Sequence, residues 1–92
     1  MGKREGARRR LAETLALPKE IVFDYPLVSL VGNEEARIEN HKGILEYREE
    51  RIRVKTSCGV LKIEGRRLVL RRVTAEALLV AGFIRQVEFV TE

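Results

Sequence analysis

The chain has 92 residues, of which 45% are hydrophobic and 35% are charged, with a net charge of +4 and a single cysteine. These values are typical of one small globular domain with a thin core, and a lone cysteine excludes a scaffold held by internal disulfides. The charge lies at one end, because residues 1–10 carry five cations against Glu5 and sum to +4, whereas residues 11–92 sum to zero. A neutral body argues against a nucleic-acid-binding fold, which carries a basic face of its own.

Residues 1–18 are predicted to form a short basic helix. Leucine and alanine recur at spacings of three and four in "RRRLAETLAL", which is the pattern of an amphipathic helix, and Pro18 ends it because the residue before a proline leaves the α region. The cations of this segment, called the basic head below, are Lys3, Arg4, Arg8, Arg9 and Arg10. Such a head is compatible with contact to an anionic lipid surface, contact to nucleic acid, or simple solvation.

After Pro18 the hydrophobic period changes to two, which predicts a single β-domain over residues 19–92. In "RIRVKTS", for example, Ile52 and Val54 share one face. Pro26 should make the first segment an edge or bent strand. The expected strand segments are "EIVFDYP", "LVSLVG", "EARIENH", "GILEYRE", "RIRVKTS", "GVLKIEG", "RRLVLRRV" and "ALLVAGFIRQVEFV", the last with a break at Gly82.

Short connectors with turn chemistry separate these segments. They are Asn40-His41-Lys42-Gly43, Ser57-Cys58-Gly59 and Glu64-Gly65-Arg66, each with a glycine available for positive φ. We therefore predict an all-β fold, a small antiparallel meander, roll or sandwich of about 7–9 short strands. The phrase "GVLKIEGRRLVL" has the rhythm of a weak repeat, so a β-solenoid-like stack is the alternative architecture.

His41 is the only histidine, and a catalytic base, a metal ligand and a turn residue are the three interpretations to compare. A metal site needs several converging ligands, and a Cys–His pair needs an orienting third group. The sequence offers only Cys58, which is 17 residues away. Neither phosphate-binding glycine motifs nor a nucleophile elbow is visible. We predict no catalytic, cofactor or metal site, and we expect Asn40, His41, Lys42 and Gly43 to form a turn.

Charged side chains of both signs alternate with the apolar ones along the middle strands. Opposite charges on paired strands fix register and discourage aggregation. This pattern predicts a solvated outer face or a polar interface. The residues are Arg51, Arg53, Lys55, Lys62, Arg66, Arg67, Arg71 and Arg72, with Glu46, Glu49, Glu50 and Glu64 among them.

The order of these elements resembles the YabP/YqfC family of sporulation proteins. The resemblance extends from about Arg8 to Val90 and rests on three pieces of sequence. They are Pro26 followed by Leu30-Val31-Gly32, the block "IENHKGILEY", and the phrase G-x-L-x-I-x-G-x-x-L that begins at Gly59. None of the three is a catalytic motif.

This resemblance implies a non-enzymatic role in endospore formation in a Gram-positive bacterium, with no cofactor. It implies protein–protein contact on the mother-cell side, in the cytoplasm or peripherally at the forespore membrane, together with a YqfD-like membrane protein. Asn40, His41, Lys42 and Gly43 would be a family signature. An anionic membrane surface and a second copy of the chain are further expected contacts, and nucleic acid is not. A YabP-like spore coat assembly factor and, from another class, a small nucleic-acid-binding regulator are the alternatives.

Overall fold

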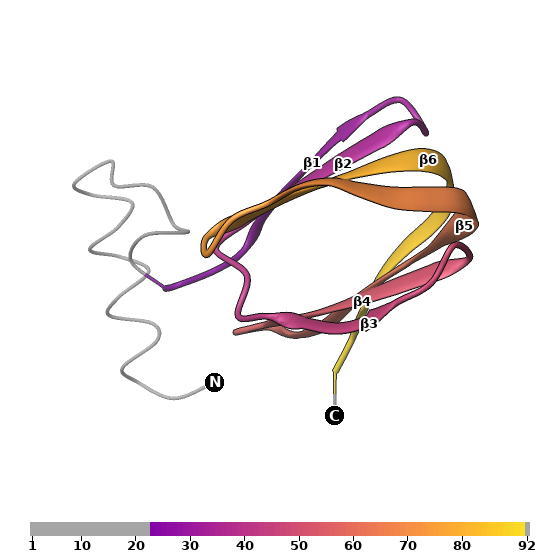
Figure 1. Ribbon diagram of the computed structural model, residues 1–92. Helices are drawn as coiled ribbons and strands as arrows, with labels where there is room; N and C mark the ends of the chain where they lie inside the picture. The colour runs from indigo at the N-terminus through magenta and orange to yellow at the C-terminus, as the bar shows by residue number, and fades with distance from the viewer. Residues whose placement is uncertain (1–22, 92) are drawn as a thin grey trace.

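The computed structural model describes residues 23–91, so the predicted basic helix and the boundary at residue 18 lie outside the described residues. The described chain is all-β, as the sequence predicted (Figure 1). Its strands are β1 (Leu27–Val31), β2 (Glu35–Glu39), β3 (Ile44–Tyr47), β4 (Arg51–Thr56), β5 (Gly59–Val73) and β6 (Ala77–Val90).

All six strands belong to one antiparallel sheet in the order β1-β2-β6-β5-β4-β3. The sheet is open, but β5 and β6 are long and bend midway, so that it folds back on itself (Figure 1). One layer holds β1 and β2 with the adjoining halves of β5 and β6. The other layer holds β3 and β4 with the remaining halves.

The bend lies where two glycines allow the backbones of β5 and β6 to approach closely. A methyl group at Gly65 would overlap the carbonyl oxygen of Phe83, and one at Gly82 would lie 2.5 Å from the carbonyl oxygen of Arg67. Gly82 also has φ +135, and Arg67 has φ +53. Register shifts around these residues mark β-bulges, which bend a strand.

Two hairpin turns cover the bend and satisfy backbone groups there. The N–H of Gly65 donates to the Glu50 carbonyl (3.1 Å) in the β3–β4 turn. On the other layer, the N–H of Ile84 donates to the Asn33 carbonyl (2.7 Å) in the β1–β2 turn. Buried backbone donors need such partners, so the turns hold the sheet in its folded shape.

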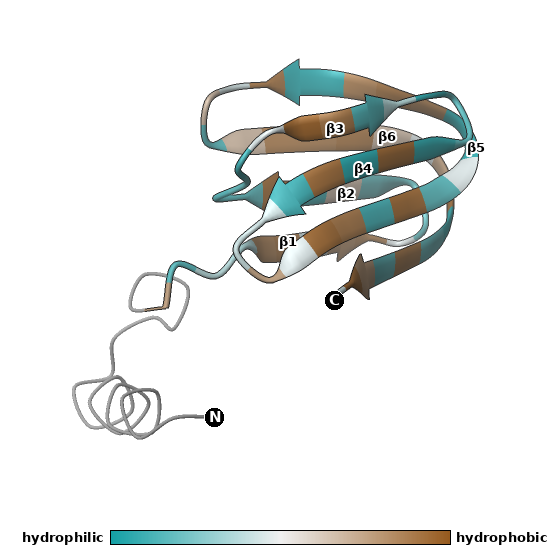
Figure 2. Ribbon diagram, turned by 90° about the horizontal axis from the view of Figure 1, so that it is seen from below, coloured by the Kyte–Doolittle hydropathy of each residue, from teal (hydrophilic) through white to brown (hydrophobic). Residues whose placement is uncertain are grey.

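The core lies between the two layers and comes from the apolar positions of the alternating strands. Figure 2 shows this alternation as hydrophobic and hydrophilic bands along β4 and β5. Ile52 and Val54, which were expected to share a face, are both fully buried. The core residues are Ala36, Ile38, Ile52, Val54, Leu61, Ile63, Leu68, Leu78, Val80 and Ile84.

Three sequence predictions about the strands are wrong. Residues 23–26 form no strand, and β1 is the edge strand among the described residues. The segments on either side of Gly65 are one continuous strand, β5, and Gly82 bends β6 without ending it. The described residues form six strands, whereas the predicted 7–9 also covered residues outside them. The physical reason is that Gly65 and Gly82 allow two backbones to approach closely within a strand. A glycine between two apolar segments instead predicts a turn when only the local sequence is considered. Among residues 23–91 no helix is long and apolar enough to cross a membrane.

Candidate functional site: the Asn40–Gly43 link and the bend patch

Residues 40–43 connect two strands that are not paired with each other. β2 lies between β1 and β6, whereas β3 pairs with β4. The connection therefore passes from one layer of the folded sheet to the other (Figure 1). The expected turn is therefore not a hairpin between paired strands, because pairing partners far along the chain determine where β2 and β3 lie.

Asn40 and Gly43 supply the backbone conformations that this link requires. Asn40 has φ +63 and Gly43 has φ +128, in the region that most side chains avoid but asparagine and glycine tolerate. The N–H of Asn40 donates to the carbonyl of Glu76 (2.7 Å), and the N–H of Lys42 donates to the carbonyl of Lys55 (2.7 Å). The link is thus tied to both layers.

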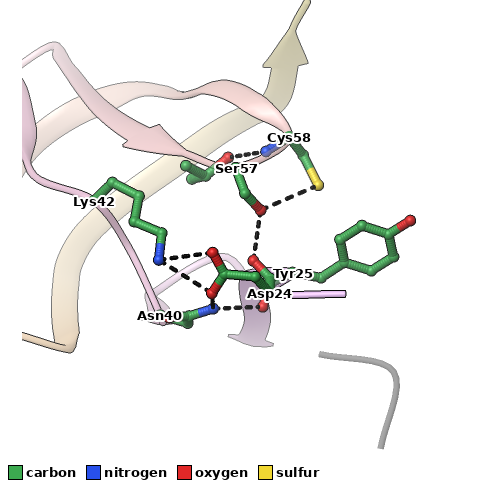
Figure 3. A network of polar contacts seen from close by, with 7 residues as sticks. Asp24, Tyr25, Asn40, Lys42, Ser57 and Cys58 are labelled. Carbon is green, nitrogen blue, oxygen red and sulfur yellow. Dashed lines mark hydrogen bonds and ion pairs between the residues drawn. The ribbon is translucent and has the colours of Figure 1, made fainter. Parts of the chain in front are cut away.

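The side chains of Asn40 and Lys42 converge on Asp24, just before β1 (Figure 3). Asn40 Nδ2 donates to Asp24 Oδ1 (2.8 Å) and to the Tyr25 carbonyl (3.2 Å). Lys42 Nζ lies 2.9 Å from Asp24 Oδ2. The hydrogen bond from Asn40, followed by that from Lys42, lowers the pKa of the Asp24 carboxyl below its ordinary value.

The β4–β5 turn completes this polar cluster. Ser57 Oγ donates to the carbonyl of Asp24 (2.5 Å), and the Cys58 N–H donates to Thr56 Oγ1 (3.0 Å) (Figure 3). Three segments that are distant in sequence therefore meet at Asp24. Sequence reasoning missed Asp24, which lies 16 residues before Asn40, because the local pattern placed it within a strand.

His41 fastens the link to a second turn. Its Nδ1 accepts the Gly43 N–H (3.0 Å), so the ring proton lies on Nε2, which donates to the Thr74 carbonyl (3.0 Å). Thr74 in turn closes the β5–β6 turn, since its Oγ1 accepts the Ala77 N–H (2.9 Å). Both ring nitrogens are thereby engaged in structural hydrogen bonds.

This geometry does not assemble a nucleophile and a base. His41 contacts the β5–β6 turn, whereas Cys58 lies in the β4–β5 turn. Within residues 23–91 there is no group of three His, Cys, Asp or Glu side chains that could hold a metal ion. The five cations of the basic head lie outside the described residues. The link is a structural joint that fixes how the two layers meet.

A second feature, the bend patch, lies on the outer surface where the sheet folds. We define it as Phe83 with Arg66, Arg67, Arg71 and Arg85; Glu34 and Glu35 of the β1–β2 side line the same hollow as Arg67 and Arg71. Phe83 is 54% exposed, and the Arg66 guanidinium carbon lies 5.6 Å from the centre of its ring, within cation–π range. Phe83 contributes to two shallow hollows of about 340 and 140 Å³.

Sequence reasoning did not single out Phe83. Ile84 is buried, whereas its neighbour Phe83 is exposed. The position of Phe83 directly after Gly82, in an alternating strand, was the sequence signal that could have identified it as an outward-facing aromatic residue. Elsewhere the charged side chains of the middle strands form ion pairs. Arg53 Nε lies 2.9 Å from Glu46 Oε1 on the paired strand, and Lys62 Nζ lies 3.1 Å from Glu64 Oε1 on the same strand. The Lys62 hydrogen bond lowers the pKa of Glu64.

In residues 23–91, the fold and these surfaces define a small all-β domain, built as one folded antiparallel sheet with a polar joint and an exposed aromatic patch. The sequence model of the YabP family matches residues 26–92, and the chain belongs to this family. It is also 31% identical to the Bacillus subtilis (strain 168) protein named Uncharacterized protein YqfC, over 98% of each chain. No solved structure matches.

Both comparisons confirm the resemblance stated from the sequence. The family relation suggests a sporulation-related protein, and the family is not a known enzyme family.

Proposed function

We propose that this chain is a non-enzymatic sporulation factor that acts by protein–protein contact next to a membrane. Family membership supports the relation to sporulation. The exposed Phe83 among arginines is the observation that carries the contact role, because aromatic and arginine side chains dominate the binding energy of protein interfaces.

The chemistry of the bend patch fits a partner segment that is both apolar and acidic. Phe83 offers an aromatic face to an apolar side chain, and the arginines offer paired donors to carboxylates. Following the resemblance, we propose a YqfD-like membrane protein as this partner. The basic head adds contact with an anionic leaflet, where each cation near the surface is worth about 1 kcal/mol.

A pull-down from detergent-solubilised membranes of sporulating cells tests the partner. The full chain should recover a YqfD-like membrane protein, and Phe83→Ser should lose it. Val73→Ser is the matched control, because Val73 is 55% exposed, like Phe83 at 54%, but lies at the far end of β5. Equal recovery by the two variants would contradict a role for the bend patch.

The other candidate roles give different results in the same experiment. Recovery of coat proteins in place of a membrane protein would support a YabP-like spore coat assembly factor. Binding to nucleic acid that falls steeply with salt and survives removal of residues 1–17 would support the regulator.

Flotation with anionic vesicles tests the basic head separately. The full chain should float with the vesicles, and residues 18–92 should not. Equal flotation of both would refute the lipid contact without affecting the partner proposal.

A further inference from the structure

The outer edge of β1 differs from the opposite edge of the sheet. Within residues 23–91, β1 pairs only with β2, and β3 pairs only with β4. Edge strands of soluble proteins are usually kept short, charged or bulged, which prevents pairing with other chains. β3 follows this rule, since it has four residues, contains Glu46 and has a register shift. β1 has five residues, LVSLV, none of them charged and with no register shift against β2.

Within residues 23–91, no strand covers the apolar interior at this edge of the sheet. Val28 and Leu30 pair with Ile38 and Ala36, which are fully buried, so both face the interior side of the sheet. Leu30 is nevertheless 53% exposed. A further strand beside β1 would cover it and continue the core.

The sequence of β1 is complementary to itself in the antiparallel direction. If two copies meet with Ser29 at the two-fold axis, Val28 lies opposite Leu30 on the interior side. Leu27 then lies opposite Val31 on the outer side, and Ser29 lies opposite its own copy. Apolar pairs that lie directly opposite each other stabilise an antiparallel strand pair, and no like charges are opposed. A two-fold axis of this kind is the commonest symmetry of protein dimers.

We propose that two copies of this chain associate through antiparallel pairing of their β1 strands. The two six-stranded sheets then become one continuous sheet. A single strand pair buries little surface, so the dimer is weak and depends on concentration. The bend patch lies on β5 and β6, which are separated from β1 by β2, so this self-association goes beyond the proposed partner contact and uses a different surface.

Sedimentation of the full chain over a range of concentrations tests the dimer. Ser29→Lys puts two like charges at the axis, and Ser29 is an exposed edge residue, so the fold should persist. We expect this variant to weaken dimerisation by at least about tenfold. The matched control, Leu45→Lys on β3, where Leu45 is 49% exposed, should dimerise like the wild type. A wild type that stays monomeric throughout, or equal weakening by both variants, would overturn the proposal.

Crosslinking tests the register without relying on stability. In a Cys58→Ser background, Ser29→Cys should form a covalent dimer on mild oxidation, because opposite residues in an antiparallel pair have Cβ atoms about 4.5–5.5 Å apart. Leu45→Cys in the same background should stay monomeric. Equal crosslinking of the two cysteines would show that the β1 edges do not meet.

Discussion

The backbone of Asn40 offers a sharp test of the link between the layers. Its φ of +63 lies in the left-handed region, where alanine destabilises the folded state by about 1–2 kcal/mol. At an ordinary position glycine is less stable than alanine by roughly 0.5–1 kcal/mol, because it loses more freedom on folding. The two effects oppose each other at residue 40.

We therefore expect Asn40→Gly to be more stable than Asn40→Ala by about 0.5–1 kcal/mol. Both variants lose the side-chain hydrogen bonds to Asp24 and to the Tyr25 carbonyl, so this loss cancels in the comparison. Each variant should be less stable than the wild type for the same reason.

Urea unfolding followed by circular dichroism measures the difference. With a slope near 1 kcal/mol per M for a small domain, the two midpoints should differ by about 0.5–1 M. Arg37, exposed on β2 and without a positive φ, supplies the control, where Arg37→Ala should be more stable than Arg37→Gly. If alanine is equal to or better than glycine at residue 40, the left-handed link is refuted.

Three further predictions concern the bend and the joint. Gly65→Ala should lower the free energy of unfolding by about 3 kcal/mol or more, because its methyl group meets the paired backbone of β6. Gly32 has φ +53 and open space around it, so the control Gly32→Asn should lower it by less than about 1 kcal/mol in the same urea assay. Similar midpoints for the two variants would contradict the close approach. Folding lowers the pKa of Asp24, so its stabilisation is present at neutral pH and is lost as the pH falls below about 4. Asp24→Asn should thus lower the melting temperature at pH 7 more than under strongly acidic conditions, and a constant difference would refute this linkage. His41→Ala should lower the free energy of unfolding by about 1 kcal/mol. It should also speed hydrogen exchange at the Gly43 amide, which donates to His41 Nδ1, and an unchanged exchange rate would exclude that bond.

The sequence by itself determined the fold class and most of the core. Alternation of apolar and polar residues is a local property of a strand. It put Ile52 and Val54 on one face, and both are fully buried. Alternation does not give the degree of burial at the margins of the sheet, where Tyr47 on the edge strand β3 is 50% exposed. How exposed a residue is depends on whether its strand lies at the edge or in the middle of the sheet, and alternation does not give the order of the strands.

The tertiary structure alone decided the roles of the connecting residues. Gly65 was read as a turn and is instead the point where two long strands touch, because the atom that excludes a side chain belongs to Phe83 on the next strand. The "NHKG" segment was recognised as special from its residue types, and asparagine and glycine do adopt left-handed backbone there. That it joins two layers and converges on Asp24 could not be predicted, because those contacts follow from strand pairings between residues far apart in the chain, which local sequence patterns do not specify.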